Sequence, residues 1–336
     1  MNLRTDQIER IKDLGYTESE ARFLYIVAIH SGYFTLGQFR TFTRTRYGKR
    51  PTSFAHKLTE RGHAAARDYL RRGFVFHLFS RTVYGQIEKD NLRNRRRHSF
   101  DFIRTRLVLL DFILANQDLA YFETEQDKVS FFCENLGLSK DLLPARVYIG
   151  GPGSRPTIRY FVDKFPLFLA PPSHGASPVV TFCFVDSGSA TISDFATHLV
   201  AYQALLRQLG TFRFVYIAPK DAPFRSAEER FKTVMKRPLE CDMSADILRY
   251  FVIRKKWENR EYVVPVTADL EFLSEAKQRF QADRFEDLYG SWRSGSLNER
   301  DLQVEFRQLV PDRTVLFETY LVKGNPSPLA LDGRRG

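Results

Sequence analysis

The chain has few cysteines and no long apolar segment. Its three cysteines, Cys133, Cys183 and Cys241, lie far apart and form neither a Cys-x-x-Cys pair nor an even disulfide set. Such sparse cysteine is typical of a protein in a reducing compartment. The segment MNLRTDQIERIKDLG contains no apolar signal core, and no run of about 18 apolar residues follows it. The sequence therefore predicts a cytoplasmic protein that does not span a membrane.

Several motifs of catalytic and cofactor-binding sites are also missing. The segment GGPGSRP at 150–156 lacks the Gly-Lys-Ser/Thr ending of a phosphate-binding loop, and its composition predicts a turn. No Gly-x-Ser-x-Gly elbow surrounds Ser187 or Ser189. The seven histidines show no metal-ligand spacing. We therefore expect no resident cofactor and favour a protein without catalysis of its own.

What the chain does contain is a concentrated block of positive charge. Residues 40–106 hold eighteen Lys and Arg against five Asp and Glu, a net charge of +13, whereas the whole chain carries +11. The rest of the chain is therefore slightly acidic. A localised basic block attracts the phosphate backbone of nucleic acids, although a charge run can also be only a solvated surface. Which of these two interpretations applies to the basic block depends on the helices and strands that carry its charges.

The same block has the element order of a small DNA-binding module. Thr17 and Glu20 have the spacing of a helix capping box, and a second short helix follows. Pro51 suits the first turn of a third helix, and two strands come next, joined by a turn at 70–73. Three helices followed by a two-stranded ribbon predict a winged helix-turn-helix over residues 1–90, whose third helix enters the major groove of DNA.

In a winged helix, the third helix, the loop before it and the wing face the DNA. We expect hydroxyls near the start of the third helix to contact phosphates, and His56 and Lys57 to reach base edges. The candidate DNA-binding residues of this module are Arg44, Arg46, Lys49, Arg50, Thr52, Ser53, His56, Lys57, Arg71 and Arg72. The alternative is a non-DNA adaptor subunit of a larger complex, with a basic rim.

A basic and then apolar segment follows the module. Residues 91–115 predict one long helix, within a connecting segment over 91–117. In its basic half, Arg95, Arg96 and Arg97 extend the candidate DNA-binding surface. Its apolar half either joins the two domains or forms a dimer contact, and we favour packing within the chain.

An α/β pattern begins near residue 118. It predicts an antiparallel start and then a strand–helix–strand crossover, in which the nearly all-apolar segment FRFVYIAP is typical of a strand buried on both faces. The predicted fold class is therefore α+β, with an α/β domain over 118–235 after the winged helix. A helical extension over 236–322 could bind a protein partner or a second copy of the chain in a homodimer. A flexible tail is expected over 323–336.

The order of these elements resembles that of a known family. The predicted winged helix, the helix that begins near His98, and the segments IRYFVD, FVDSGSATISDFATHLVAYQALL and FRFVYIAP are similar to those of bacterial replication-relaxation proteins, which are found on plasmids and integrative elements. The resemblance covers roughly residues 15–235. It implies a winged-helix domain that binds double-stranded DNA, followed by a restriction-endonuclease-like domain.

The resemblance also implies the positions of a nuclease site. Asp163 and Asp186 match the two acidic positions of the endonuclease-like fold, and Glu123 could add a third carboxylate. In a working nuclease such carboxylates hold Mg²⁺, and a lysine two residues after the second acid stabilises developing charge. Here Gly188 replaces that lysine, and Val162 replaces the usual proline before the first acid. We therefore expect a degenerate site, the alternative being a metal-dependent DNA endonuclease that uses Asp163 and Asp186.

Overall fold

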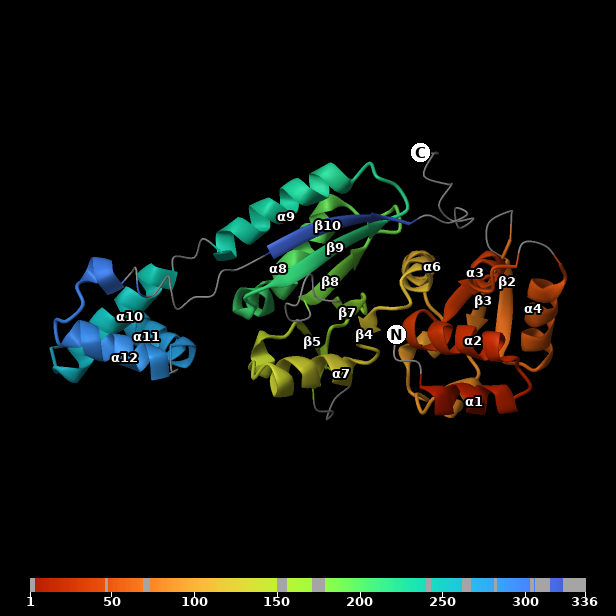
Figure 1. Ribbon diagram of the computed structural model, residues 1–336, viewed down its shortest axis with the longest axis horizontal. Helices are drawn as coiled ribbons and strands as arrows, with labels where there is room; N and C mark the ends of the chain where they lie inside the picture. The colour runs from red at the N-terminus through yellow and green to blue at the C-terminus, as the bar shows by residue number, and fades with distance from the viewer. Residues whose placement is uncertain are drawn as a thin grey trace. The chain divides into compact units, whose positions relative to one another are not determined.

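A computed structural model describes residues 4–45, 48–68, 73–149, 156–170, 179–239, 243–261, 267–280, 283–302, 305 and 315–322. The chain is a mixed α+β protein, as its sequence predicts, and it divides into two units (Figure 1). The first unit comprises residues 1–232 and 315–336, and the second comprises residues 233–314. Among the described helices, none is long and apolar enough to cross a membrane.

The N-terminal part of the first unit combines helices with a small antiparallel sheet. In chain order its elements are α1 (Thr5–Asp13), α2 (Glu18–His30), β1 (Tyr33–Thr35), α3 (Leu36–Phe42), α4 (Arg50–Glu60), β2 (Ala64–Asp68), β3 (Phe74–Leu78) and α5 (Arg81–Gln86). The strand order is β1-β3-β2. Three helices followed by a two-stranded ribbon are therefore present as predicted, whereas β1 and α5 have no counterpart among the predicted elements.

Local sequence explains where these helices begin. Thr17 accepts a hydrogen bond from the backbone N–H of Glu20, whose carboxylate accepts one from the N–H of Thr17, so the predicted capping box is confirmed. Thr35 and Gln38 form the same arrangement at the start of α3. The helices bury their apolar faces in a cluster of phenylalanine rings, Phe23, Phe34, Phe39, Phe54 and Phe76. Each such ring contributes about 1.5–3 kcal/mol when it is buried.

The segment 91–115 forms two elements instead of the one helix that its sequence predicts. A short 3₁₀ turn, η1 (Arg93–Arg95), comes first, and α6 (Phe100–Ala115) begins later. The break has a nonlocal cause, because the buried side chain of Asn94 donates hydrogen bonds to two backbone carbonyl oxygens of α2. The apolar half of α6 packs against residues of α2 and of the large sheet in one core cluster. Packing of this half within the chain is therefore confirmed.

The large sheet of the first unit has the strand order β10-β9-β8-β7-β4. Its strands are β4 (Ala120–Tyr121), β7 (Leu167–Ala170), β8 (Val179–Val185), β9 (Phe212–Ala218) and β10 (Val315–Leu321). Strands β8, β9 and β10 are parallel, and α8 (Ile192–Gln208) connects β8 to β9, whereas β7 pairs antiparallel with both β8 and β4. The predicted antiparallel start and the strand–helix–strand crossover are both present.

Smaller elements connect β4 to β7. They are α7 (Glu125–Ser130), the π-helical turn η2 (Phe131–Asn135), the 3₁₀ turn η3 (Lys140–Leu142), β5 (Ala145–Tyr148) and β6 (Thr157–Tyr160). Strands β5 and β6 form a separate antiparallel pair. The turn between β6 and β7 and the start of α7 both face the N-terminal helices in the pocket described below.

The second unit is an insertion in the chain of the first. Its described helices are α10 (Met243–Glu258), α11 (Thr267–Arg279) and α12 (Asp283–Arg293), and α9 (Phe224–Leu239) leads into it. These helices have an apolar core cluster of their own. The prediction of a helical extension over 236–322 is wrong at its end, because β10 returns to the large sheet and pairs with β9 over seven residues. The predicted tail, 323–336, lies outside the described residues.

Candidate nucleic-acid interface

Helix α4 has one face in the core and one face in solvent. Phe54 and Leu58, one turn apart, are fully buried. Thr52, Ser53 and His56 are exposed on the remaining surface of the helix. The hydroxyl of Thr52 donates to the backbone oxygen of Lys49 at 2.8 Å. The hydroxyl of Ser53 and the imidazole of His56 are groups that can donate to phosphates or meet base edges in a groove.

The chain segment that leads into α4 carries exposed cations. Arg44, Lys49 and Arg50 all have exposed side chains. Arg44 has a φ of +52°, a left-handed conformation that turns the chain after α3. Arg50 donates from Nη2 to Oγ of Ser19 at 2.5 Å. These three predicted residues therefore adjoin the exposed face of α4 in the chain, and Arg46 lies outside the described residues.

The side chain of Lys57 is directed away from this exposed face. Its Nζ lies 2.7 Å from Oε2 of Glu20 and 5.4 Å from the centre of the Tyr16 ring. The Glu20 side chain is only 7% exposed, and its carboxylate also completes the capping box of α2. Lys57 therefore anchors α4 to the start of α2, which corrects the expectation that its ammonium group reaches toward bases.

Of the other predicted surface residues, Arg71 and Arg72 lie outside the described residues. Arg95 donates from Nε to the carbonyl oxygen of Phe79 at 3.1 Å, and its guanidinium lies 5.8 Å from the centre of the Tyr84 ring. Arg95 therefore fastens η1 to the end of the small sheet instead of facing solvent freely.

Arg96 and Arg97 are exposed beside the small sheet. The hydroxyl of Tyr33, whose ring stacks on His77, donates to the carbonyl oxygen of Arg96 at 3.1 Å. Burial raises the pKa of Tyr33, and the positive charges of Arg67 and Arg97 oppose that rise. Arg67, which is half-buried on β2, is thus a nearby cation that the sequence prediction omitted.

The carboxylate of Asp163, in the turn after β6, already has hydrogen-bond partners. Its Oδ1 accepts from the backbone N–H of Phe165 at 2.9 Å. Its Oδ2 accepts from the hydroxyl of Tyr202 at 2.7 Å and lies 3.4 Å from Nδ1 of His198. Both partners of Oδ2 come from α8, so Asp163 ties this turn to the helix that covers the sheet.

The carboxylate of Asp186 is buried at the end of β8 and is also occupied. Its Oδ1 accepts from the backbone N–H groups of Gly188 and Ala190, and its Oδ2 accepts from the hydroxyl of Tyr216. Gly188 has a φ of +90°, which glycine adopts most readily. The turn therefore explains why glycine stands where an active nuclease of this type would have its lysine.

Glu123 has a third, separate environment. Its two carboxylate oxygens accept from the hydroxyl of Tyr25 at 3.0 and 3.1 Å, and burial raises its pKa. The three predicted carboxylates thus have different hydrogen-bond partners. Within the described ranges, no group of three or more His, Cys, Asp and Glu residues is arranged to hold a metal ion.

Comparison with protein-family models, with curated proteins and with solved structures gives no match for this chain. The resemblance to replication-relaxation proteins therefore stays a prediction from element order and short motifs. Any function has to be argued from the charge and geometry of the residues themselves.

Proposed function

We propose that this protein binds double-stranded DNA through a winged helix-turn-helix formed by residues 17–80. Helices α2, α3 and α4 are its three helices, and the β2–β3 hairpin is its wing. Helix α4 enters the major groove, where its exposed face meets base edges while neighbouring cations contact phosphates. The order of the elements and the concentration of positive charge on them support this proposal.

The two-sided character of α4 carries the proposal. Its inner face is fixed by aromatic packing, while Thr52, Ser53 and His56 lie in solvent. Lys49 and Arg50 stand at its N-terminal end, where helix N–H groups also attract phosphates. A helix whose inner face is fixed by packing, and whose polar groups lie on its outer face, loses little conformational entropy when it binds DNA.

We further propose that the protein serves a plasmid or another mobile element and does not cut DNA. The resemblance to replication-relaxation proteins supports the first part. The internal hydrogen bonds of Asp163 and Asp186 support a scaffold role for a restriction-endonuclease-like sheet domain. The inserted second unit is then available for a protein partner or a second copy of the chain.

Fluorescence anisotropy with a labelled duplex of about 30 base pairs, enough for two half-sites, tests DNA binding directly. The double variant Lys49→Ala with Arg50→Ala should bind about tenfold more weakly or worse, because two phosphate contacts are lost. Lys220→Ala with Arg225→Ala removes the same charge from exposed positions after β9 and is the matched control. Equal losses in both double variants would mean that only net charge matters and that α4 is not the recognition helix.

The salt dependence of binding separates DNA recognition from an adaptor role. Among the predicted DNA-binding residues that the structure describes, the exposed cations that form no ion pair with a described carboxylate are Arg44, Lys49, Arg50, Arg96 and Arg97. Each phosphate that is neutralised changes the slope of log K against log salt by about −0.9, so these five predict a slope of about −4 to −5. The double variant at positions 49 and 50 should reduce that slope by about 2. An adaptor that does not bind DNA would show no saturable binding at any salt concentration.

A further inference from the structure

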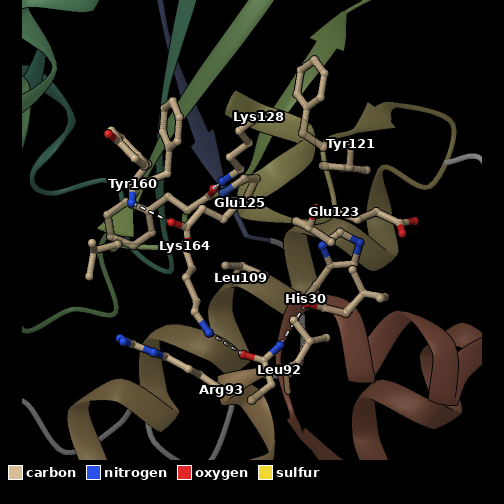
Figure 2. A pocket seen from close by; sticks show the side chains of 18 of the residues that line it. His30, Leu92, Arg93, Leu109, Tyr121, Glu123, Glu125, Lys128, Tyr160 and Lys164 are labelled. Carbon is tan, nitrogen blue, oxygen red and sulfur yellow. Dashed lines mark hydrogen bonds between the residues drawn. The ribbon is translucent and has the colours of Figure 1, made fainter. Parts of the chain in front are cut away.

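A pocket lies within the first unit, between the N-terminal helices and the large sheet (Figure 2). Side chains from η1, α6, α7 and the turn between β6 and β7 line a cavity of about 110 Å³. A single water molecule requires roughly 10–15 Å³ by the same kind of measure. The pocket therefore has room for a group of several heavy atoms.

The lining of this pocket is cationic. Four positively charged side chains line it without a salt bridge to any described carboxylate, Arg93, Arg106, Lys128 and Lys164. A fifth cation, Arg159, is paired with Glu125 at 2.7 Å. The other acidic residue of the lining, Glu123, accepts its hydrogen bonds from Tyr25. The pocket thus carries an excess of positive charge, which the nearby carboxylate of Asp163 offsets only in part.

Neutral oxygen atoms hold these cations and leave N–H groups unused. Arg106 donates from its two terminal nitrogens to the backbone oxygens of Lys164 and Asp163, so that, among the described residues, two of its five N–H groups have an acceptor. Lys128 donates to one backbone oxygen, although its ammonium group has three protons. The ammonium group of Lys164 donates to Oδ1 of Asn94 at 3.5 Å. A dashed line from Lys164 marks this hydrogen bond in Figure 2.

The positive charges affect three of the buried titratable groups in the lining, Lys164, Lys128 and His30. Burial and the charges of Arg106 and Arg93 lower the pKa of Lys164 to about 7. Burial lowers the pKa of Lys128 to about 8, against the attraction of Asp163. Burial and the charge of Lys128 also lower the pKa of His30 to about 3. Buried charges of one sign are costly unless an opposite charge or further acceptors compensate them.

We propose that this pocket binds a small tetrahedral oxyanion, either inorganic phosphate or the phosphate group of a small metabolite, through Arg93, Arg106, Lys128 and Lys164. Its oxygens would accept from the unused N–H groups, and its two negative charges would offset the excess of cations. Guanidinium and ammonium groups are the usual donors to phosphate in proteins. A double helix is far too wide for this cavity, so the site is distinct from the proposed DNA interface.

A bound anion would also stabilise η1 and the segment that follows η1 in the chain. Arg93 lines the pocket from η1, and Arg96 and Arg97 come directly afterwards. An anion that attracts Arg93 would therefore hold η1 in place. A ligand that binds only the folded state raises the melting temperature according to its concentration.

Thermal unfolding of the full chain, measured at constant ionic strength in chloride, sulfate and phosphate, tests the site. Phosphate should raise the melting temperature in a saturable way, while chloride should not. Isothermal titration calorimetry should then show that Lys164→Gln and Arg93→Gln each weaken phosphate binding about tenfold or more, since each removes a charged donor. Lys89→Gln, a cation outside this lining, is the matched control and should bind phosphate as the unchanged protein does.

Three results would overturn the proposal. The first is an equal effect of chloride and phosphate on the melting temperature. The second is an unchanged affinity for phosphate in Arg93→Gln. Because Arg93 is partly exposed, this variant keeps the test valid if Lys164→Gln does not fold. The third is stabilisation only by a DNA oligonucleotide with a terminal phosphate, which would assign the pocket to DNA ends. Duplex binding by Lys164→Gln should remain unchanged, so failure here leaves the proposed DNA interface untouched.

Discussion

Neighbouring positions on α4 have opposite roles, and two alanine variants should separate stability from DNA binding. Lys57 neutralises the buried carboxylate of Glu20, which also fixes the start of α2. Lys57→Ala leaves that carboxylate without its cation, and the free energy of unfolding should fall by about 1.5–3 kcal/mol. In a folding unit of this size each kcal/mol changes the melting temperature by about 2–4 °C, so we expect a decrease of about 3–12 °C.

His56→Ala is the matched control at the adjacent residue. The His56 side chain is 72% exposed, and its contact with Glu60, 3.0 Å from Nδ1, is an exposed pair within one helix. Such pairs contribute little to stability, so the melting temperature should not change measurably. The affinity for duplex DNA should instead fall several-fold, because the imidazole is on the face that we propose enters the groove. Differential scanning calorimetry and fluorescence anisotropy on the same preparations measure both effects.

Either of two results would refute this assignment of faces. A Lys57→Ala variant as stable as the unchanged protein would mean that the contact with Glu20 does not hold α4 to α2. If Lys57→Ala lost as much DNA affinity as His56→Ala well below its melting temperature, then Lys57 would contact DNA. The faces of α4 would then have to be reassigned.

Three further tests concern the buried carboxylate of Asp186, the pocket residue Lys164 and the strand β10. Supercoiled plasmid incubated with Mg²⁺ or Mn²⁺ should remain uncut, and cutting that is lost in Asp186→Ala would instead establish the nuclease alternative. Lys164→Met should raise the melting temperature near pH 7 in phosphate-free buffer, and this gain should shrink toward pH 10. The pKa of Lys164 in the folded state, about 7, lies below its value in the unfolded state, so the free energy that the folded state loses by holding a charged lysine disappears as the pH rises from the lower to the higher pKa. An equal gain at both pH values would contradict this. A chain that ends before Val315 should unfold or aggregate, because β9 loses its parallel partner β10. A chain that ends after Val322 should fold normally, and circular dichroism distinguishes the two results.

Elements that depend on neighbouring residues could be predicted from the sequence, and elements that depend on distant partners could not. The capping box at Thr17 and Glu20 is complete within four residues, so its sequence pattern defines the start of α2. Strand β1 has only three residues, Tyr33–Thr35, and exists because β3 pairs with it across a long stretch of chain. The break before α6 depends on Asn94, whose partners are on α2. No local pattern indicates such contacts.

The same distinction applies to the candidate sites. Phe54 and Leu58 are one turn apart in the sequence, the spacing typical of the inner face of a helix, and both are buried on α4. This spacing did not indicate that the long side chain of Lys57 bends toward a buried carboxylate, since that carboxylate belongs to another helix. The pocket could likewise not be predicted from the sequence, because Arg106, Lys128 and Lys164 come from three separate segments that only tertiary packing brings together.

The segment after the small sheet shows why a charge count overstates the surface available to DNA. Four arginines there lie within five residues, yet Arg93 lines the pocket and Arg95 is fastened to the backbone of Phe79. Only Arg96 and Arg97 are exposed. Counterion release depends on cations that reach phosphates, and inward-facing cations contribute nothing to it. The cations of the basic block therefore include exposed residues such as Arg96 and Arg97, which could reach a polymer of phosphates if the proposed function holds, and two, Arg93 and Arg106, that line the inner pocket.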